Sequence, residues 1–182
     1  ALKRLNEVMV LGTGAIEIKS GYGLTVDAEL KMLRVIKALK NNSPIPIKAT
    51  FLGAHTYPTQ FKNNHQAYIN AIKNEMLPII AKENLADFID VFCEENFFSV
   101  DETISICNAG KELGLKPKIH ANQLSISGAV EAGVKLGAVS VDHLEMMDDK
   151  AINTLSTSNT IATLLPTAAF FLRMNYPPAR EL

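Results

Sequence analysis

The feature that most constrains the fold of this chain is the repeated alternation of two kinds of segment. A short run, usually rich in Ile, Val and Phe, ends in polar residues, and an amphipathic stretch follows it. Such runs occur at residues 15–18, 47–52, 88–92, 117–120, 139–141 and 160–165. Short apolar runs are typical of strands buried on both faces of a parallel sheet. The alternation therefore predicts βαβ units and an α/β fold.

The stretches between the runs carry helix signals. Residues 26–39 have acidic side chains in the first turn and lysines in the last, which suits the helix dipole. Ser99 and Glu102 have the spacing of a capping box at the start of a further helix. Residues 65–83 contain Pro78, which predicts a kink or two shorter helices because proline cannot donate a helical hydrogen bond.

The spacing of the runs points toward a barrel without deciding for it. One strand and its helix take roughly 29 residues, so eight units would need about 235, close to the roughly 250 of a (β/α)₈ barrel. The chain has 182 residues and only the runs given above. The residues alone leave an open doubly wound sheet and an incomplete barrel as alternatives.

Composition excludes several classes of partner. Apolar residues make up 47% of the chain, charged residues 20%, and the formal net charge is −1. We therefore expect no nucleic-acid partner and no attraction to an anionic membrane, and no apolar run approaches the roughly 18 residues of a membrane span. Cys93 and Cys107 match neither a zinc motif nor a disulfide framework, which favours two reduced thiols in a cytoplasmic protein.

The glycine loops do not match a nucleotide site. Gly12 and Gly14 precede their predicted strand, whereas a dinucleotide-binding loop follows one. Gly21 and Gly23 do follow a strand, but the third glycine and a Walker lysine are missing. A Rossmann-like binding module is therefore disfavoured.

Polar residues gather where the predicted strands end. His55, His120 and His143 stand at or just past the carboxyl ends of three runs, and Tyr22 follows the first run. These ends meet on one face of a barrel, which predicts a polar site of metal or acid–base type. Each residue alone also fits a packed, hydrogen-bonded side chain. The chain has no His-x-His, His-Glu-x-x-His or Gly-x-Ser-x-Gly pattern, so these residues do not form a recognisable ligand or nucleophile set.

Five segments share the pattern of a known family. They are residues 17–24 (EIKSGYGL), 50–55 (TFLGAH), 90–94 (DVFCE), 118–124 (KIHANQL) and 142–145 (DHLE). Together they resemble imidazolonepropionase, of the amidohydrolase superfamily, from one end of the chain to the other. The resemblance implies an incomplete metal-dependent-hydrolase (β/α)₈ TIM barrel that holds strands 2 to 7 with their helices.

The resemblance also implies what the chain lacks. Residues 1–182 are expected to be the central part of a single amidohydrolase barrel domain, with the β-sandwich domain of the family absent from this chain. The family's first strand carries a His-x-His metal pair, its eighth strand a metal-binding Asp, and an arginine after the first strand holds the substrate's propionate. All of these are expected to lie outside the chain.

Individual roles follow from the resemblance, residue by residue. His120 matches a metal-binding histidine, and Gln123 matches the position that hydrogen-bonds the imidazolone ring. Tyr22 and His55 match residues that contact the substrate, and His143 matches a catalytic histidine beside the metal. The residues expected to be structural are His65, Glu94 and Arg173.

The resemblance implies hydrolysis of 4-imidazolone-5-propanoate to N-formimidoyl-L-glutamate in histidine degradation. One divalent metal, Zn or Fe, activates the water that attacks the ring carbonyl. The expected setting is the cytoplasm, with a homodimer as the assembly considered for the full-length protein. The fragment alone is expected to be inactive. The alternatives are another cyclic-amide hydrolase of the superfamily and a non-catalytic barrel fragment.

Overall fold

The computed structural model describes residues 1–182, and each predicted run forms a strand. The strands are β1 (Ile16–Lys19), β2 (Ile47–Ala54), β3 (Phe88–Cys93), β4 (Lys116–Ala121), β5 (Ser140–His143) and β6 (Ile161–Leu164). The helices are α1 (Leu2–Val10), α2 (Val26–Asn42), α3 (His65–Ala71), α4 (Leu77–Glu83), α5 (Val100–Glu112), α6 (Ala129–Leu136), α7 (Asp149–Ser156) and α8 (Pro166–Leu172). None of them has the length and apolar character needed to cross a membrane.

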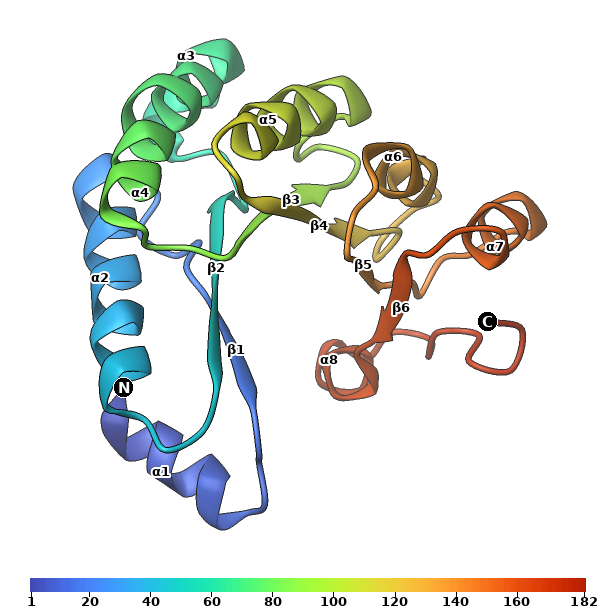
Figure 1. The fold of residues 1–182 in the computed structure, drawn as a ribbon. Helices are drawn as coiled ribbons and strands as arrows, with labels where there is room; N and C mark the ends of the chain where they lie inside the picture. Colours follow the sequence, from blue (N-terminus) through green and yellow to red (C-terminus); the bar gives the residue numbers. More distant parts are fainter.

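The strands form one parallel sheet in which spatial order follows chain order, β1-β2-β3-β4-β5-β6. A doubly wound sheet reverses its strand order at a switch point, and this sheet does not. The sheet instead curls into an incomplete barrel (Figure 1). The predicted fold class is therefore confirmed, and the doubly wound alternative is wrong.

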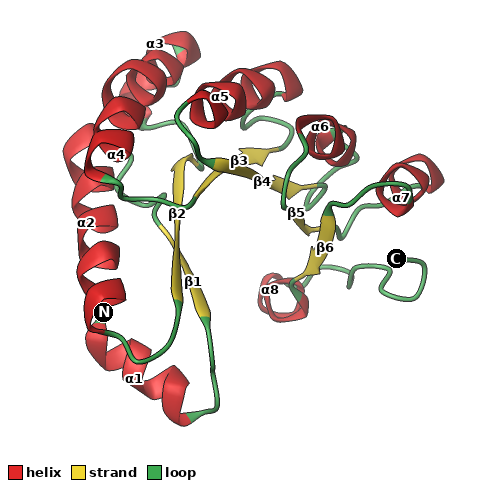
Figure 2. Cartoon of the chain, viewed as in Figure 1, coloured by secondary structure: helices red, strands yellow, loops and turns green.

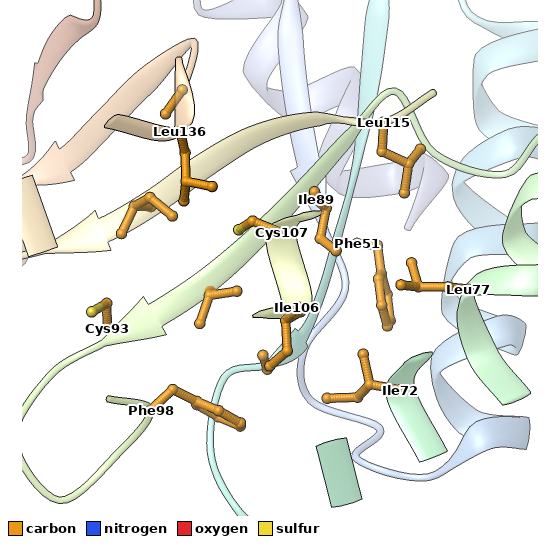
Figure 3. Packing of buried hydrophobic residues seen from close by; sticks show 14 of the residues in the cluster. Phe51, Ile72, Leu77, Ile89, Cys93, Phe98, Ile106, Cys107, Leu115 and Leu136 are labelled. Atoms are coloured by element: carbon orange, nitrogen blue, oxygen red, sulfur yellow. The ribbon is translucent and has the colours of Figure 1, made fainter. Parts of the chain in front are cut away.

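Helices cover the convex face of the curled sheet. Figure 2 shows α2 to α7 on the outside of the curve, while α8 lies at the end of β6. The core fills the space between sheet and helices, as Figure 3 shows for Phe51, Ile89 and Ile106 with their neighbours. Because the apolar core packs on the convex face of the sheet, polar groups can occupy the concave face. In a barrel the residues that stabilise the fold therefore differ from those that form the site.

The predicted helix signals act as expected. Ser99 caps α5 in a complete capping box with Glu102, whose carboxylate accepts the Ser99 N–H at 2.8 Å. The segment with Pro78 divides into α3, a π-helical turn η2 (Ile72–Met76) and α4, with the proline in the first turn of α4. A short 3₁₀ turn, η1 (Thr59–Phe61), precedes α3. Proline is tolerated in a first turn because its missing N–H would have no helical partner there.

The expectation that strands are buried on both faces holds only for the inner strands. Residues of β1 are half-buried, and Ile161 at the start of β6 is exposed, because each of these strands has a neighbour on one side only. Polar and apolar residues also alternate along the strands more than predicted. Polar residues recur at every second position, such as Glu17 with Lys19 and Lys118 with His120, and hydrogen-bond to one another across the sheet.

Candidate active site

The four residues singled out at strand ends lie in a row. The Tyr22 and His55 rings are 5.3 Å apart between centroids, His55 and His120 are 6.1 Å apart, and His120 and His143 are 5.1 Å apart. The row follows β1, β2, β4 and β5, and the Phe92 ring at the end of β3 lies 6.0 Å from His55. Parallel strands in sequential order bring these ends to one rim. The predicted convergence is present in the structure.

The His120 ring is oriented by a buried carboxylate. Its Nδ1 lies 3.0 Å from Asp90 on the neighbouring strand β3, and the Asp90 side chain is fully buried. A carboxylate at Nδ1 selects the tautomer that leaves Nε2 without its proton. This is the arrangement in which metal-ligating histidines are commonly held.

Lys19 joins two strands of this cluster. Its Nζ donates to Asp90 Oδ2 at 2.6 Å and to Asp142 Oδ2 at 3.1 Å, and lies 3.3 Å from Glu17. Burial opposes the charged lysine, but Asp90, Asp142 and Glu17 together hold the pKa of Lys19 above its ordinary value. Burial likewise opposes the Asp90 charge, yet His120 and Lys19 hold the pKa of Asp90 well below its usual range. Both groups are therefore charged at neutral pH.

Three residues of this cluster form the only group in the chain with the spacing of a metal site. Donor atoms of Asp90, His120 and Asp142 all lie within 4.8 Å of one another. Lys19 already pairs with both carboxylates, so those oxygens face an ammonium group. Among these three residues the imidazole of His120 fits a metal best. A hydrolytic metal site needs about three protein ligands, so His120 by itself does not form one.

His143 ends β5 in an unusual backbone conformation. Its φ is +88° and that of Leu144 is +67°, a region that residues other than glycine seldom adopt. Burial, and then the neighbouring His120, lower the pKa of His143 to about 4, so the imidazole is neutral at pH 7. Its buried Nδ1 has no hydrogen-bond partner, and the nearest carboxylate oxygen, of Glu145, is 3.7 Å away. Such backbone strain often accompanies functional sites.

Tyr22 and His55 belong to one connected loop structure. Tyr22 is 79% exposed and so is open to a ligand, in contrast to the buried tyrosines of the core. His55 Nδ1 lies 3.0 Å from the carbonyl oxygen of Gly21, which orients the ring toward Tyr22. A hydrogen bond to the preceding loop thus links the βα loops that follow β1 and β2.

Gln123 lies in the loop after β4, and Glu94 binds the backbone of that loop. Gln123 is buried two residues past the end of that strand. Glu94, which follows β3, is also buried; its carboxylate accepts the Leu124 N–H at 2.8 Å and a hydrogen bond from Ser125. The carboxylate therefore ties together the βα loops that follow β3 and β4.

The remaining chemically active side chains are those of His65, Arg173, Cys93 and Cys107. His65 stacks on Tyr57 with 3.6 Å between ring centroids, and Arg173 ends α8 with a φ of +57°. Both cysteines are buried and unpaired; burial raises the pKa of Cys93 to about 11 and that of Cys107 further still. Neither thiol is a nucleophile at neutral pH.

Curated relatives match nearly the whole chain. No family model matches it, but an imidazolonepropionase of Flavobacterium johnsoniae is 58% identical over 179 residues, covering 98% of this chain and 44% of that protein. The imidazolonepropionase of Christiangramia forsetii is 54% identical over 180 residues, covering 99% and 44%. That of Shewanella piezotolerans is 48% identical over 180 residues, with the same coverage. The chain thus spans under half the length of these relatives.

Solved structures of similar shape include two deaminases. A guanine deaminase from C. acetobutylicum superposes with a TM-score of 0.69 at 16% identity, covering 98% of this chain and 46% of that one. An Arabidopsis N6-mAMP deaminase has a TM-score of 0.67 at 11% identity, covering 94% and 54%. Identities this low support the fold alone. Sequence and fold agree: this chain is a homologue of the imidazolonepropionases over 98% of its length and forms a curled, incomplete α/β barrel.

Proposed function

We propose that the full-length protein carrying this chain is an imidazolonepropionase. It would hydrolyse 4-imidazolone-5-propanoate to N-formimidoyl-L-glutamate. The observation that carries the proposal is the row Tyr22, His55, His120 and His143 at the ends of parallel strands, with the His120 ring held by buried Asp90. The similarity to imidazolonepropionases over 98% of the chain supports the choice of substrate.

His120 is the metal ligand in this proposal. Asp90 at Nδ1 leaves Nε2 as the nitrogen for a divalent ion, Zn or Fe. An ion held there would lower the pKa of a bound water toward about 7, so that hydroxide would be available to attack an otherwise unreactive ring carbonyl. The remaining ligands are expected from strands outside residues 1–182.

The other rim residues handle the substrate. Tyr22, His55 and Gln123 are proposed to hold the flat imidazolone ring, because all three follow strand ends on the same rim. Orientation of the ring toward the attacking water can remove several kcal/mol from the barrier, of order 7 kcal/mol when alignment is complete. Because Tyr22 is exposed, it can close over a ligand without breaking any contact of the core.

His143 is proposed to move the proton. When water adds to the carbonyl, the ring C–N bond breaks and the departing nitrogen needs a proton. Burial keeps the His143 imidazole neutral, and its buried Nδ1 is not engaged by another group. In this proposal His143 takes the proton released by the attacking water and passes it to the departing nitrogen. The proposal places the reaction in the cytoplasm, in keeping with two cysteines that form no disulfide.

The decisive experiment assays the full-length protein for loss of imidazolone absorbance in the ultraviolet. We expect turnover by the wild-type protein and almost none by His120→Ala, which should also lose most of its metal by elemental analysis. His65→Ala is the matched control, since the His65 ring stacks on Tyr57 and on none of the four rings of the row, and it should leave metal content and turnover unchanged.

Two results would contradict the proposal. Full metal occupancy in His120→Ala would show that His120 is not a ligand. A metal-loaded wild-type protein that ignores 4-imidazolone-5-propanoate but opens another cyclic amide would keep the chemistry and replace the substrate.

A further inference from the structure

Glu29 is a fully buried carboxylate that no part of the proposed mechanism uses. It lies in the first turn of α2, and its two oxygens accept hydrogen bonds only from the backbone of the loop after β1. The Gly21 N–H donates to Oε2 at 2.9 Å, and the N–H groups of Gly23 and Leu24 donate to Oε1 at 2.7 and 3.0 Å. The loop therefore wraps around an internal anion.

The path of this loop requires glycine at positions 21 and 23. Gly21 has a φ of +106°, and a Cβ there would lie 2.7 Å from the Leu52 carbonyl oxygen. A Cβ on Gly23 would lie 2.7 Å from the carbonyl carbon of Ala28. Loops with converging N–H groups commonly bind anions such as phosphate. Here the protein's own carboxylate takes that place, which agrees with the absence of a nucleotide motif.

The same loop carries two of the proposed substrate residues. Tyr22 lies between Gly21 and Gly23, and the N–H groups of both glycines donate hydrogen bonds to Glu29. The Gly21 carbonyl, on the other side of its residue, lies 3.0 Å from His55 Nδ1. One buried carboxylate thus determines the path of the backbone at Tyr22 and the acceptor that orients His55.

We infer that Glu29 is a positioning residue for substrate binding, acting through the loop to place Tyr22 and His55. The inference rests on the proposed function, which assigns those two residues to the substrate. Charge-assisted hydrogen bonds to backbone N–H groups are strong, so a neutral, partly donating side chain at this position should loosen the loop.

The test compares Glu29→Gln with wild type in the metal-loaded, full-length protein. Glutamine keeps the size of the side chain but loses the charge and one acceptor oxygen. We expect KM to rise about tenfold with a smaller change in kcat. Hydrogen exchange read by mass spectrometry should show loss of protection in the peptide over residues 20–24, with metal content unchanged.

A double-mutant cycle with Tyr22→Phe separates positioning from simple support of the fold. If Glu29 acts through Tyr22, adding Glu29→Gln to Tyr22→Phe should raise KM by only about twofold more. Loss of folded molecules would instead lower the apparent kcat and leave KM unchanged. Glu102→Gln is the matched control: it also removes a carboxylate that accepts a backbone N–H, but at the start of α5, and KM should not change.

Each outcome decides the matter. A wild-type KM in Glu29→Gln, or effects of Glu29→Gln and Tyr22→Phe that simply multiply, would overturn the inference. If Glu29→Gln does not fold, Glu29→Asp takes its place, because the shorter carboxylate cannot reach all three N–H groups and the same two criteria apply. Absence of wild-type turnover overturns the proposed function itself, and is seen before any variant is compared.

Discussion

At the scale of single residues, the site depends on buried charges that compensate one another. Asp90 is fully buried and contacts both His120 and Lys19. An isolated carboxylate would be costly to bury, but two cationic or donating partners offset that cost. Asp90 therefore both orients the His120 ring and, through Lys19, links strands of the sheet.

Replacing Asp90 by Asn should weaken metal binding in the full-length protein by about 10–100-fold. The amide can still accept from His120 Nδ1 but no longer supplies the negative charge that makes the ring a better ligand. Competition with a chelator of known affinity measures the change. Asp87→Asn is a suitable control, because Asp87 pairs with Lys40 and Lys48 at the surface. Equal affinity in both variants would remove Asp90 from the site.

At the scale of secondary-structure elements, the close approach of α6 to the sheet depends on Gly133. A Cβ at this position would lie 2.6 Å from Val141 Cγ1 on β5 and 3.5 Å from Ile119 on β4. Valine is stiff at χ1, so the contact cannot be relieved by a simple rotation. The helix can pack this closely against β4 and β5 because the side chain is absent.

We expect Gly133→Ala to lower the free energy of unfolding. Overpacking costs about 1–3 kcal/mol, whereas the better helix propensity of alanine returns about 1 kcal/mol, so the net effect is a loss of up to about 2 kcal/mol. Urea unfolding of the full-length protein measures it. Gly14→Ala, with nothing within 4 Å of the added methyl group, should be neutral or slightly stabilising. A stabilised Gly133→Ala variant would show that α6 can shift outward freely.

At the scale of the whole molecule, the sheet has two unpaired outer edges. β1 pairs only with β2, and β6 only with β5. Large apolar side chains are exposed on α8, with Phe170 at 72% and Phe171 at 83%. Unpaired strand edges and exposed apolar surface both favour association with other chains.

Residues 1–182 expressed alone should therefore elute from a sizing column as oligomers larger than the full-length protein. They should also show no imidazolone turnover with any added divalent metal, since His120, with His143 nearby, provides too few ligands for a hydrolytic site. The full-length protein is the control in both measurements. A monomeric, active chain would place the metal site elsewhere.

The sequence by itself determined the elements and their direction. Apolar runs separated by capped amphipathic stretches specify strands and helices locally, so Ser99 and Pro78 could be assigned their roles in advance. Sequential βα units also imply that His55, His120 and His143 emerge at one rim, because successive parallel strands point the same way. The metal role proposed for His120 came from resemblance to a family and not from spacing, since the chain holds no complete ligand pattern.

Only the tertiary structure decided whether the sheet is doubly wound or curls toward a barrel, and which charged side chains pair. The doubly wound and barrel alternatives differ in strand order, a long-range property that local periodicity does not contain. The pairing of Asp90 with His120 and Lys19, and the burial of Glu29 and Glu94, likewise depend on residues that are distant in the chain. An acidic residue in a sequence looks solvated until packing supplies its partners, because burial is tolerated only when those partners are present.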